Sequence, residues 1–190
     1  MNLFGLPAGS NTSGPIRIEG PGLPQVVARA TVSTPVDLSD ASKGVKGSEF
    51  QSYTAASPEA VAPDGTPVVT YPGVQKYAGI RTNLILAEVS GQPARVRLRL
   101  VNGTTGGVLS EVDKTLGPWE KLQVNDMWNG SGGFAVGDAA LDKVSVSMEP
   151  IGDETGSVVG ALSVIDNVTN SSRILVLAPP GAPQGGAIGF

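Results

Sequence analysis

The chain has 190 residues, with 13 Lys and Arg against 17 Asp and Glu, so its formal net charge is -4. This length fits one domain or two small ones and can bury about 70% of the unfolded surface. A slightly acidic chain lacks the clustered positive field of a dedicated nucleic-acid-binding protein. The absence of histidine and cysteine removes imidazole bases, thiolate nucleophiles, disulfides and thiolate zinc sites. We therefore expect no nucleic-acid partner and no enzymatic activity.

Glycine and proline punctuate the whole chain, with 26 and 15 residues respectively, and both residues break helices. Valine and leucine also run throughout, so the composition is that of a folded protein. No run approaches the ~18 consecutive apolar residues of a membrane-spanning helix. Helical periodicity is absent over three turns, and strand-sized runs recur at roughly 8 to 14 residues. The sequence predicts an all-β antiparallel sandwich of about eight to ten strands.

In chain order, residues 14–20 and 23–34 predict two strands joined at Gly20-Pro21-Gly22, and residues 48–54 predict a third strand. Residues 55–79 contain four prolines and predict a loop or an edge segment. Further strands are predicted at 80–89, 94–101, 107–115, 120–125, 143–149, 157–166 and 172–178. We divide the chain into an N-terminal half-module, 1–79, that packs onto a sandwich module, 80–178, followed by a Gly/Pro-rich tail or linker, 179–190.

In the stretch "RVRLRL" (95–100) three arginines alternate with aliphatic residues. This pattern fits either a basic binding surface or the solvent-facing side of a strand. A hairpin with "NGTTG" as its loop sets Arg97 opposite Glu111 and Arg95 opposite Asp113. Only Arg99 is then without an acidic partner. A register shift of two residues would keep the same faces, whereas a shift of one would bury the charges. We interpret the stretch as a charge-matched outer face.

Two segments of the chain parallel each other. Residues 14–37 and 142–170 each contain an alternating strand, a Gly/Pro turn and a longer apolar strand that ends in small polar residues. This order predicts an internal repeat.

A series of short motifs follows Arg81-Thr82-Asn83: a Gly-Gln-Pro-Ala turn, a hairpin, "LGPWEKLQVNDMW" and a strand ending in "VIDNVT". In this order they resemble a repeated module of large secreted multidomain proteins of bacteria, often without an established activity. An arginine-bearing strand and a Gly-rich stretch precede the Arg-Thr-Asn strand in that module, as "VVARATV" and "GVKGSEFQSY" do here. The resemblance covers most of residues 1–178. It implies an extracellular Ig-like β-sandwich used for cohesion or adhesion.

The chain departs from that pattern at both ends. Residues 1–14 look like the middle of a module whose first strands are missing, and "VIDNVTNSSRIL" lacks the acidic-proline ending of the family strand. For Arg81, Thr82 and Asn83, which carry the resemblance, we expect a structural hydrogen-bonding role near an edge of the sandwich.

Three acidic residues are the weak candidates for metal ligands: Asp153, Glu154 and Asp166. Oxygen-rich turns can hold Ca²⁺ at the ends of a sandwich. The spacing of a twelve-residue calcium loop is absent, however, and we favour an ordinary polar turn. No other cofactor is expected.

Five asparagines, all in predicted loops, begin an Asn-x-Ser/Thr triplet and are candidate glycosylation sites: Asn11, Asn102, Asn129, Asn167 and Asn170. Loops rich in Asn, Gly, Ser and Thr also form such triplets by chance. Five aromatic residues could stack on sugar rings, although core packing is the preferred interpretation: Trp119, Trp128, Tyr53, Tyr71 and Tyr77. Trp128, beside Asn129-Gly130 in a long connection, is the expected exception.

The leading hypothesis is a non-catalytic extracellular or cell-surface structural or adhesion module. It would contact copies of itself or neighbouring modules by a sheet edge or face, and could form a filament or array. Two alternatives stay open: a carbohydrate-binding module, which needs an exposed row of aromatic residues and would bind glycans, and a virion decoration or capsid-associated protein.

Overall fold

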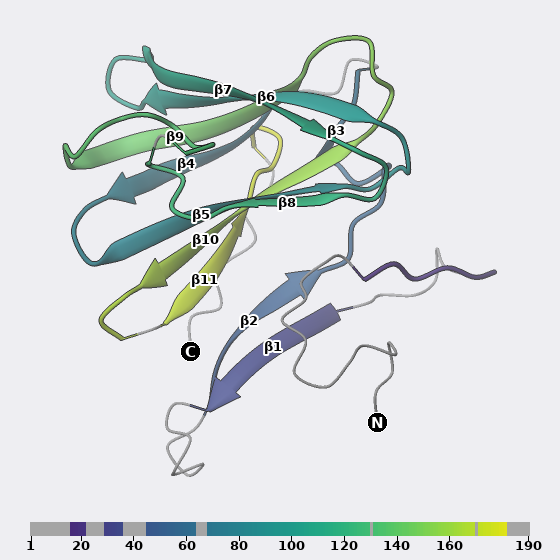
Figure 1. Cartoon of the computed structure of the whole chain (residues 1–190), viewed down its shortest axis with the longest axis horizontal. Helices are drawn as coiled ribbons and strands as arrows, with labels where there is room; N and C mark the ends of the chain where they lie inside the picture. The colour runs from purple at the N-terminus through teal and green to yellow at the C-terminus, as the bar shows by residue number, and fades with distance from the viewer. Residues whose placement is uncertain are drawn as a thin grey trace.

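The computed structural model describes residues 16–21, 29–35, 45–63, 68–129, 131–169 and 171–181, with only the backbone of 29–35 and 45–51. These residues form strands and turns. No helix among them is long and apolar enough to cross a membrane. Two antiparallel sheets pack against each other (Figure 1), which confirms the predicted all-β antiparallel sandwich.

The first layer, the β5 sheet, has the strand order β11-β10-β5-β8, and a short strand, β3, also pairs with β10. Its strands are β3 (Ala60–Val61), β5 (Ile80–Glu88), β8 (Lys121–Val124), β10 (Val158–Asp166) and β11 (Ser172–Val176). The second layer, the β6 sheet, has the order β4-β9-β6-β7. Its strands are β4 (Val69–Lys76), β6 (Ala94–Asn102), β7 (Val108–Leu116) and β9 (Leu141–Pro150).

Strands β3 and β4 precede residue 80 and nevertheless belong to the sandwich. β4 pairs with β9 and β3 pairs with β10, so the predicted division at residue 79 does not separate the strands of the two sheets. β4 lies at an edge, and its register shifts twice between Tyr71 and Lys76, around Pro72. Proline has no N–H to donate to a ladder, so an edge position is the one that suits it.

The two remaining strands, β1 (Arg29–Pro35) and β2 (Val45–Gln51), form a separate antiparallel hairpin. Residues 16–20, which we expected in a strand, form none, and β1 pairs with β2 instead. Prolines at positions 15, 21 and 24 leave few consecutive backbone donors for a ladder there. β2 lies beside β11 (Figure 1), but no ladder joins the two strands in the described part of the chain.

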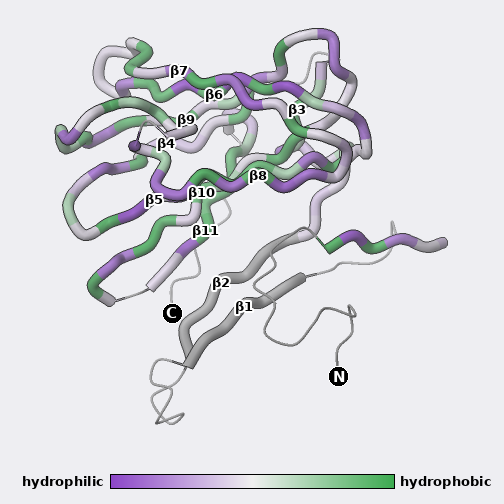
Figure 2. The backbone as a smooth tube through the Cα atoms, viewed as in Figure 1, coloured by the Kyte–Doolittle hydropathy of each residue, from purple (hydrophilic) through white to green (hydrophobic). Residues whose placement is uncertain are grey.

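The core lies between the two sheets and is built from alternate residues of their strands. Hydrophobic and hydrophilic residues alternate along these strands in Figure 2. Fully buried side chains come from both layers: Leu84, Leu86, Leu98, Leu100, Met148 and Leu162. Burial of one such side chain stabilises the fold by about 1.5–3 kcal/mol. The connection between β8 and β9 also contributes to the core, because Met127, Trp128 and Phe134 are buried in it.

The internal repeat stays a prediction, since several residues of its first copy, including 22–28, lie outside the described residues. The tail beyond residue 181 lies outside them as well.

Gly156 provides a test of the packing at one end of the sandwich. A Cβ at this position would come within 2.4 Å of the carbonyl oxygen of Gln92 and 2.6 Å of that of Pro93. Because both neighbours are backbone atoms, we expect Gly156→Ala to lower the free energy of unfolding by about 1–3 kcal/mol. Chemical denaturation measures this value.

Gly107→Ala is the matched control. A Cβ at Gly107 would meet only the Thr105 hydroxyl oxygen, at 3.4 Å, so its effect should stay within about 0.5 kcal/mol. Equal stability of the two variants would show that the approach of the chain to Gly156 is not as close as described.

Candidate functional site

The three arginines of β6 lie on the outer face of the β6 sheet, but their register differs from the predicted one. Arg97 lies opposite Asp113 and Arg99 opposite Glu111, a displacement of two residues. Because side chains alternate with a period of two, this displacement keeps every residue on its face. The predicted faces are therefore correct, while the prediction that Arg99 lacks an acidic partner is wrong.

The displacement has two local causes. The loop closes one residue later than predicted, where the N–H of Asn102 donates to the carbonyl of Gly107 at 2.8 Å. Leu109 is then left out of the ladder, because Val101 pairs with Val108 whereas Leu100 pairs with Ser110. A longer loop and a one-residue bulge together shift the strands by two.

Each arginine of this face meets an acidic group. Arg97 binds Asp113 with N–O distances of 2.8 and 3.1 Å, and Arg95 reaches the same carboxylate at 3.3 Å. The Arg97 guanidinium holds the pKa of Asp113 below its ordinary value. Arg99 lies between Glu111, at 2.8 Å, and Glu149 of β9, at 2.6 Å. Three cations thus face three anions, and the surface has no excess charge with which to attract an anionic ligand.

A buried carboxylate joins three connections at one end of the sandwich. Glu88 ends β5 and is only 1% exposed. Its Oε1 accepts hydrogen bonds from the N–H of Ser90 at 2.7 Å, from the N–H of Ser157 at 3.3 Å and from the Ser90 hydroxyl. Its Oε2 accepts from the N–H of Gly91 at 2.7 Å and of Trp119 at 2.9 Å. One side chain therefore satisfies donors from the β5–β6, β7–β8 and β9–β10 connections.

Glu88 acts as a structural anion. Burial alone would raise the pKa of its carboxyl group, because desolvation penalises the charged form. Hydrogen bonds from Ser90, Trp119 and Gly91 outweigh that effect and hold the pKa below its ordinary value. The carboxylate is therefore ionised at neutral pH and bound on both oxygens.

The β7–β8 connection places a tryptophan in a strained turn. The N–H of Glu120 donates to the carbonyl of Gly117 at 3.1 Å, with Pro118 and Trp119 between them. Trp119 has a φ of 60°. Proline followed by a residue with positive φ is the pattern of a type II turn, in which glycine or asparagine normally takes the third position. A left-handed conformation costs a residue with a Cβ about 1–2 kcal/mol, so this turn retains an indole where glycine would be less strained.

The indole of Trp119 lies between the body of the sandwich and the N-terminal part of the chain. It packs against Gly91, where an added Cβ would come within 2.6 Å of the ring. The guanidinium of Arg17 lies 4.0 Å from the ring centroid, within the ~6 Å range of a cation–π interaction. Arg17 also pairs with Glu19. Trp119 is 37% exposed, so the indole is open to a ligand.

The other aromatic residues do not extend this surface. Trp128 is 2% exposed, so the prediction that it is the exposed exception is wrong; Trp119 has that position instead. Tyr71 packs against the core. Burial raises the pKa of Tyr53 to about 12, and nearby Glu59 adds to the effect. Tyr77 is 51% exposed. It lies just before the start of β5, however, whereas Trp119 lies beside Glu88 at the other end of that strand.

The residues that carry the family resemblance differ in their surroundings. Asn83 is 5% exposed, and its Oδ1 accepts the N–H of Asp126 at 3.0 Å. The backbone carbonyl of Thr82 accepts the N–H of Met127 at 2.7 Å. The buried Thr82 hydroxyl has no partner among the described residues. Arg81 is exposed, and its structural role stays a prediction.

The three candidate metal ligands do not come together. Asp153 and Glu154 lie before β10 and Asp166 ends that strand of nine residues, which at ~3.3 Å per residue separates them by about 26 Å. Asp166 instead accepts the N–H of Val168 at 2.8 Å, within a turn. Among the described residues, no three acidic side chains cluster closely enough to hold a metal ion.

Three candidate glycosylation sites are described: Asn102 ends β6, although we expected it in a loop, whereas Asn129 and Asn167 lie in the β8–β9 and β10–β11 connections. Asn102 and its Oδ1 cap the β6–β7 loop by accepting the N–H groups of Thr104 and Thr105 at 2.8 and 3.0 Å. Asn129 and Asn167 are exposed. The sites at positions 11 and 170 lie outside the described residues, and glycosylation stays a prediction at all five.

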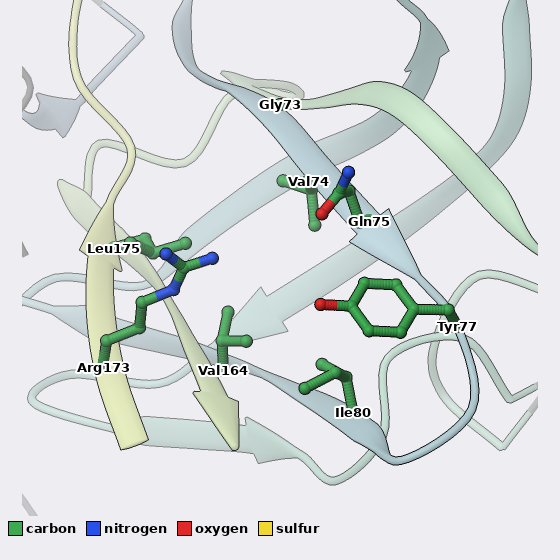
Figure 3. Close-up of a pocket in the computed structure, with 8 residues that line it drawn as sticks. All are labelled: Gly73, Val74, Gln75, Tyr77, Ile80, Val164, Arg173 and Leu175. Carbon is green, nitrogen blue, oxygen red and sulfur yellow. The ribbon is translucent and has the colours of Figure 1, made fainter. Parts of the chain in front are cut away.

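A shallow hollow opens between the two sheets beside β4 (Figure 3). Tyr77 and Arg173 face it from opposite sides, with Val164 below. Its empty volume is about 260 Å³ even when the solvent above it is included, below the ~300–1,000 Å³ of typical ligand pockets. It does not compete with Trp119 as a candidate site.

Comparisons with protein-family models, with curated proteins and with solved structures give no match to this chain. The site is therefore interpreted from its own geometry.

Replacement of Glu88 tests the junction. Glu88→Gln places an amide NH₂ where a carboxylate oxygen now accepts backbone N–H groups, and each buried donor left without an acceptor costs about 1–3 kcal/mol. We expect a loss of more than about 2 kcal/mol in the free energy of unfolding at pH 7. Chemical denaturation measures it, with Asp138→Asn as the control at an exposed acidic residue.

The effect should also depend on pH. The pKa of Glu88 is lower in the folded than in the unfolded protein, so its stabilisation is present above the unfolded pKa of about 4.3. It is lost as the pH falls through the folded value. The difference between wild type and Glu88→Gln should therefore narrow below about pH 4. A difference that does not change with pH would contradict this assignment.

Proposed function

We propose that the chain is a non-catalytic structural or adhesion module of an extracellular or cell-surface protein, which acts by contact with copies of itself or with neighbouring modules. The lack of histidine and cysteine supports this proposal. So does the arginine face, whose charges are paired within the sheet. The hollow beside β4 is too small to favour a ligand-binding role.

The edges of the two sheets differ in how open they are to a further strand. β4 contains Pro72 and two register shifts, β7 has a bulge at Leu109 and acidic side chains, and β8 has only four residues. Prolines, bulges, charges and short length all discourage strand addition at an edge. β11 pairs with β10 without a register shift from Ser172 to Val176. β8 also pairs without a register shift, but β11 is one residue longer and is the edge that lies beside β2.

The observation that carries the proposal is the β1–β2 hairpin beside that edge. A two-stranded hairpin alone is at best marginally stable in water. β2 lies beside β11, but no ladder connects them among the described residues. Pairing of β2 with β11 would extend the β5 sheet and satisfy both edges. The hairpin can come from the same chain or from a second copy, and exchange between copies would link modules into an array.

The carbohydrate-binding alternative has less support. Sugar binding by a sandwich face needs a row of exposed aromatic residues, and among the described residues Tyr77 and Trp119 lie at opposite ends of β5. A single indole at a turn does not form such a row.

Cysteine cross-linking tests the exchange, because the native chain contains no cysteine that could interfere. Single cysteines are introduced at residues 46–50 of β2 and, in separate chains, by Ile174→Cys in β11. Mixtures of a β2 variant with the β11 variant should form disulfide-linked heterodimers under mild oxidation, since the two strands meet between copies. Non-reducing electrophoresis and mass measurement detect the product.

Val168→Cys is the control for random collision, because Val168 is 84% exposed at a turn. Cross-linking that occurs only when both cysteines are in one chain would show that the hairpin packs on its own sandwich. Together with a monomeric mass at high concentration, this result would overturn assembly by exchange.

A further inference from the structure

Trp119 combines a strained backbone with a partly exposed indole. Its φ of 60° lies in a region where glycine is the ordinary residue, and backbone strain of this kind concentrates at ligand clamps and other functional positions. The strain is maintained by the surroundings, since the N–H of Trp119 is held by Glu88 at 2.9 Å. The turn therefore presents an indole from a fixed backbone.

The contact on that indole identifies the class of ligand. The guanidinium of Arg17 lies 4.0 Å from the ring centroid. Arginine is the more frequent cation in protein cation–π interactions, and tryptophan is the most favourable ring. A planar guanidinium also stacks on an aromatic face, which the ammonium group of lysine does not.

The segment that carries Arg17 is otherwise exposed. All residues from 16 to 21 are exposed, including Ile16 at 61% and Ile18 at 52%. Arg17 is the residue of this segment whose contact with the sandwich is described. One exposed cation–π contact changes an equilibrium by only about two- to fivefold. The own-chain contact is therefore weak enough to be exchanged for an identical one from outside.

We propose that the Trp119 indole is a binding site for an arginine side chain carried on an extended segment, and that in an assembly this arginine is Arg17 of a second copy. The second half rests on the proposed function. The isoleucines on either side of Arg17 favour a second copy. They stay exposed while Arg17 contacts the sandwich of its own chain, and contact between two copies would bury them.

The binding site is tested without any assembly. Arg17→Ala vacates the indole, and Trp128→Phe in the same chain leaves Trp119 as the single tryptophan, so that fluorescence reports the site alone. The probe is the peptide GPIRIEG, residues 14–20. It should change the Trp119 emission with saturation, whereas the same peptide with Gln in place of Arg should not. No change, or an equal change with both peptides, would overturn the binding site.

A matched variant separates binding from folding. Trp119→Gly relieves the strained φ and retains the backbone N–H that Glu88 binds, which offsets part of the packing lost on Gly91, so we expect it to fold, and chemical denaturation checks this. Calorimetry should show that it has lost the peptide. Retention of peptide binding by Trp119→Gly would place the site elsewhere and overturn the inference.

A mixture of two variants tests whether the arginine on the Trp119 indole comes from a second copy. Arg17→Ala keeps the indole and lacks the arginine, whereas Trp119→Gly keeps the arginine and lacks the indole. Neither variant by itself can form the contact between Arg17 and Trp119. In a mixture, Arg17 of the Trp119→Gly chain can contact Trp119 of the Arg17→Ala chain, so each pair of chains forms one such contact. Sedimentation of the mixture should show more association than either variant by itself.

A mixture that associates no more than the separate variants would show that Arg17 binds its own chain, which overturns the second-copy occupant. That outcome is distinct from failure of the proposed function, because cross-linking between β2 and β11 does not require Trp119.

Discussion

The carboxylate of Glu88 is the interaction on which this end of the sandwich depends. Its Oε2 accepts N–H groups from both Gly91 and Trp119, at 2.7 and 2.9 Å, and thereby brings two connections from different parts of the chain to one atom. The indole packs on Gly91 as a consequence. Without an acceptor at this point, the buried N–H groups of the two turns would have no hydrogen-bond partner. The hydrogen bonds within the sheets would not offset this loss of free energy. The exposed aromatic site is thus built on a buried charge.

Charge has the opposite role on the outer face of the β6 sheet. There the side chains of Arg97 and Asp113 are partly exposed and bind each other at 2.8 Å. Such pairs stabilise a fold little, but a one-residue slip would bury them, so they help to specify register. A charged strand also resists addition of a foreign strand at the neighbouring β7 edge. The same residue types therefore support the fold in one place and restrict contacts in another.

Period-two alternation predicted the faces of β6 and β7 correctly, because burial alone determines it. The predicted register was wrong by two residues. The loop length and the bulge at Leu109 determine the register but leave the alternation of faces unchanged, so the alternation could not reveal them. The burial of Trp128 depends on how the long β8–β9 connection enters the space between the sheets, which no local pattern records. Glu88 was missed because an acidic residue at a strand end normally faces solvent; the turn residues Ser90 and Gly91 that follow it were the available signal.

The N-terminal part of the chain contacts the sandwich at two separate places. The order of the β5 sheet places β8, which Trp119 precedes, at one edge and β11, beside β2, at the other. Arg17 contacts Trp119 in the connection before β8, whereas β2 lies beside β11. Two different surfaces that each accept a segment of the same chain make a head-to-tail interface, and such interfaces continue into rings or filaments unless the rotation closes a pair. Under the proposed exchange, one-way transfer of the N-terminal segments leaves a free acceptor on the last copy and continues into an array, whereas reciprocal transfer between two copies fills every acceptor and closes a dimer.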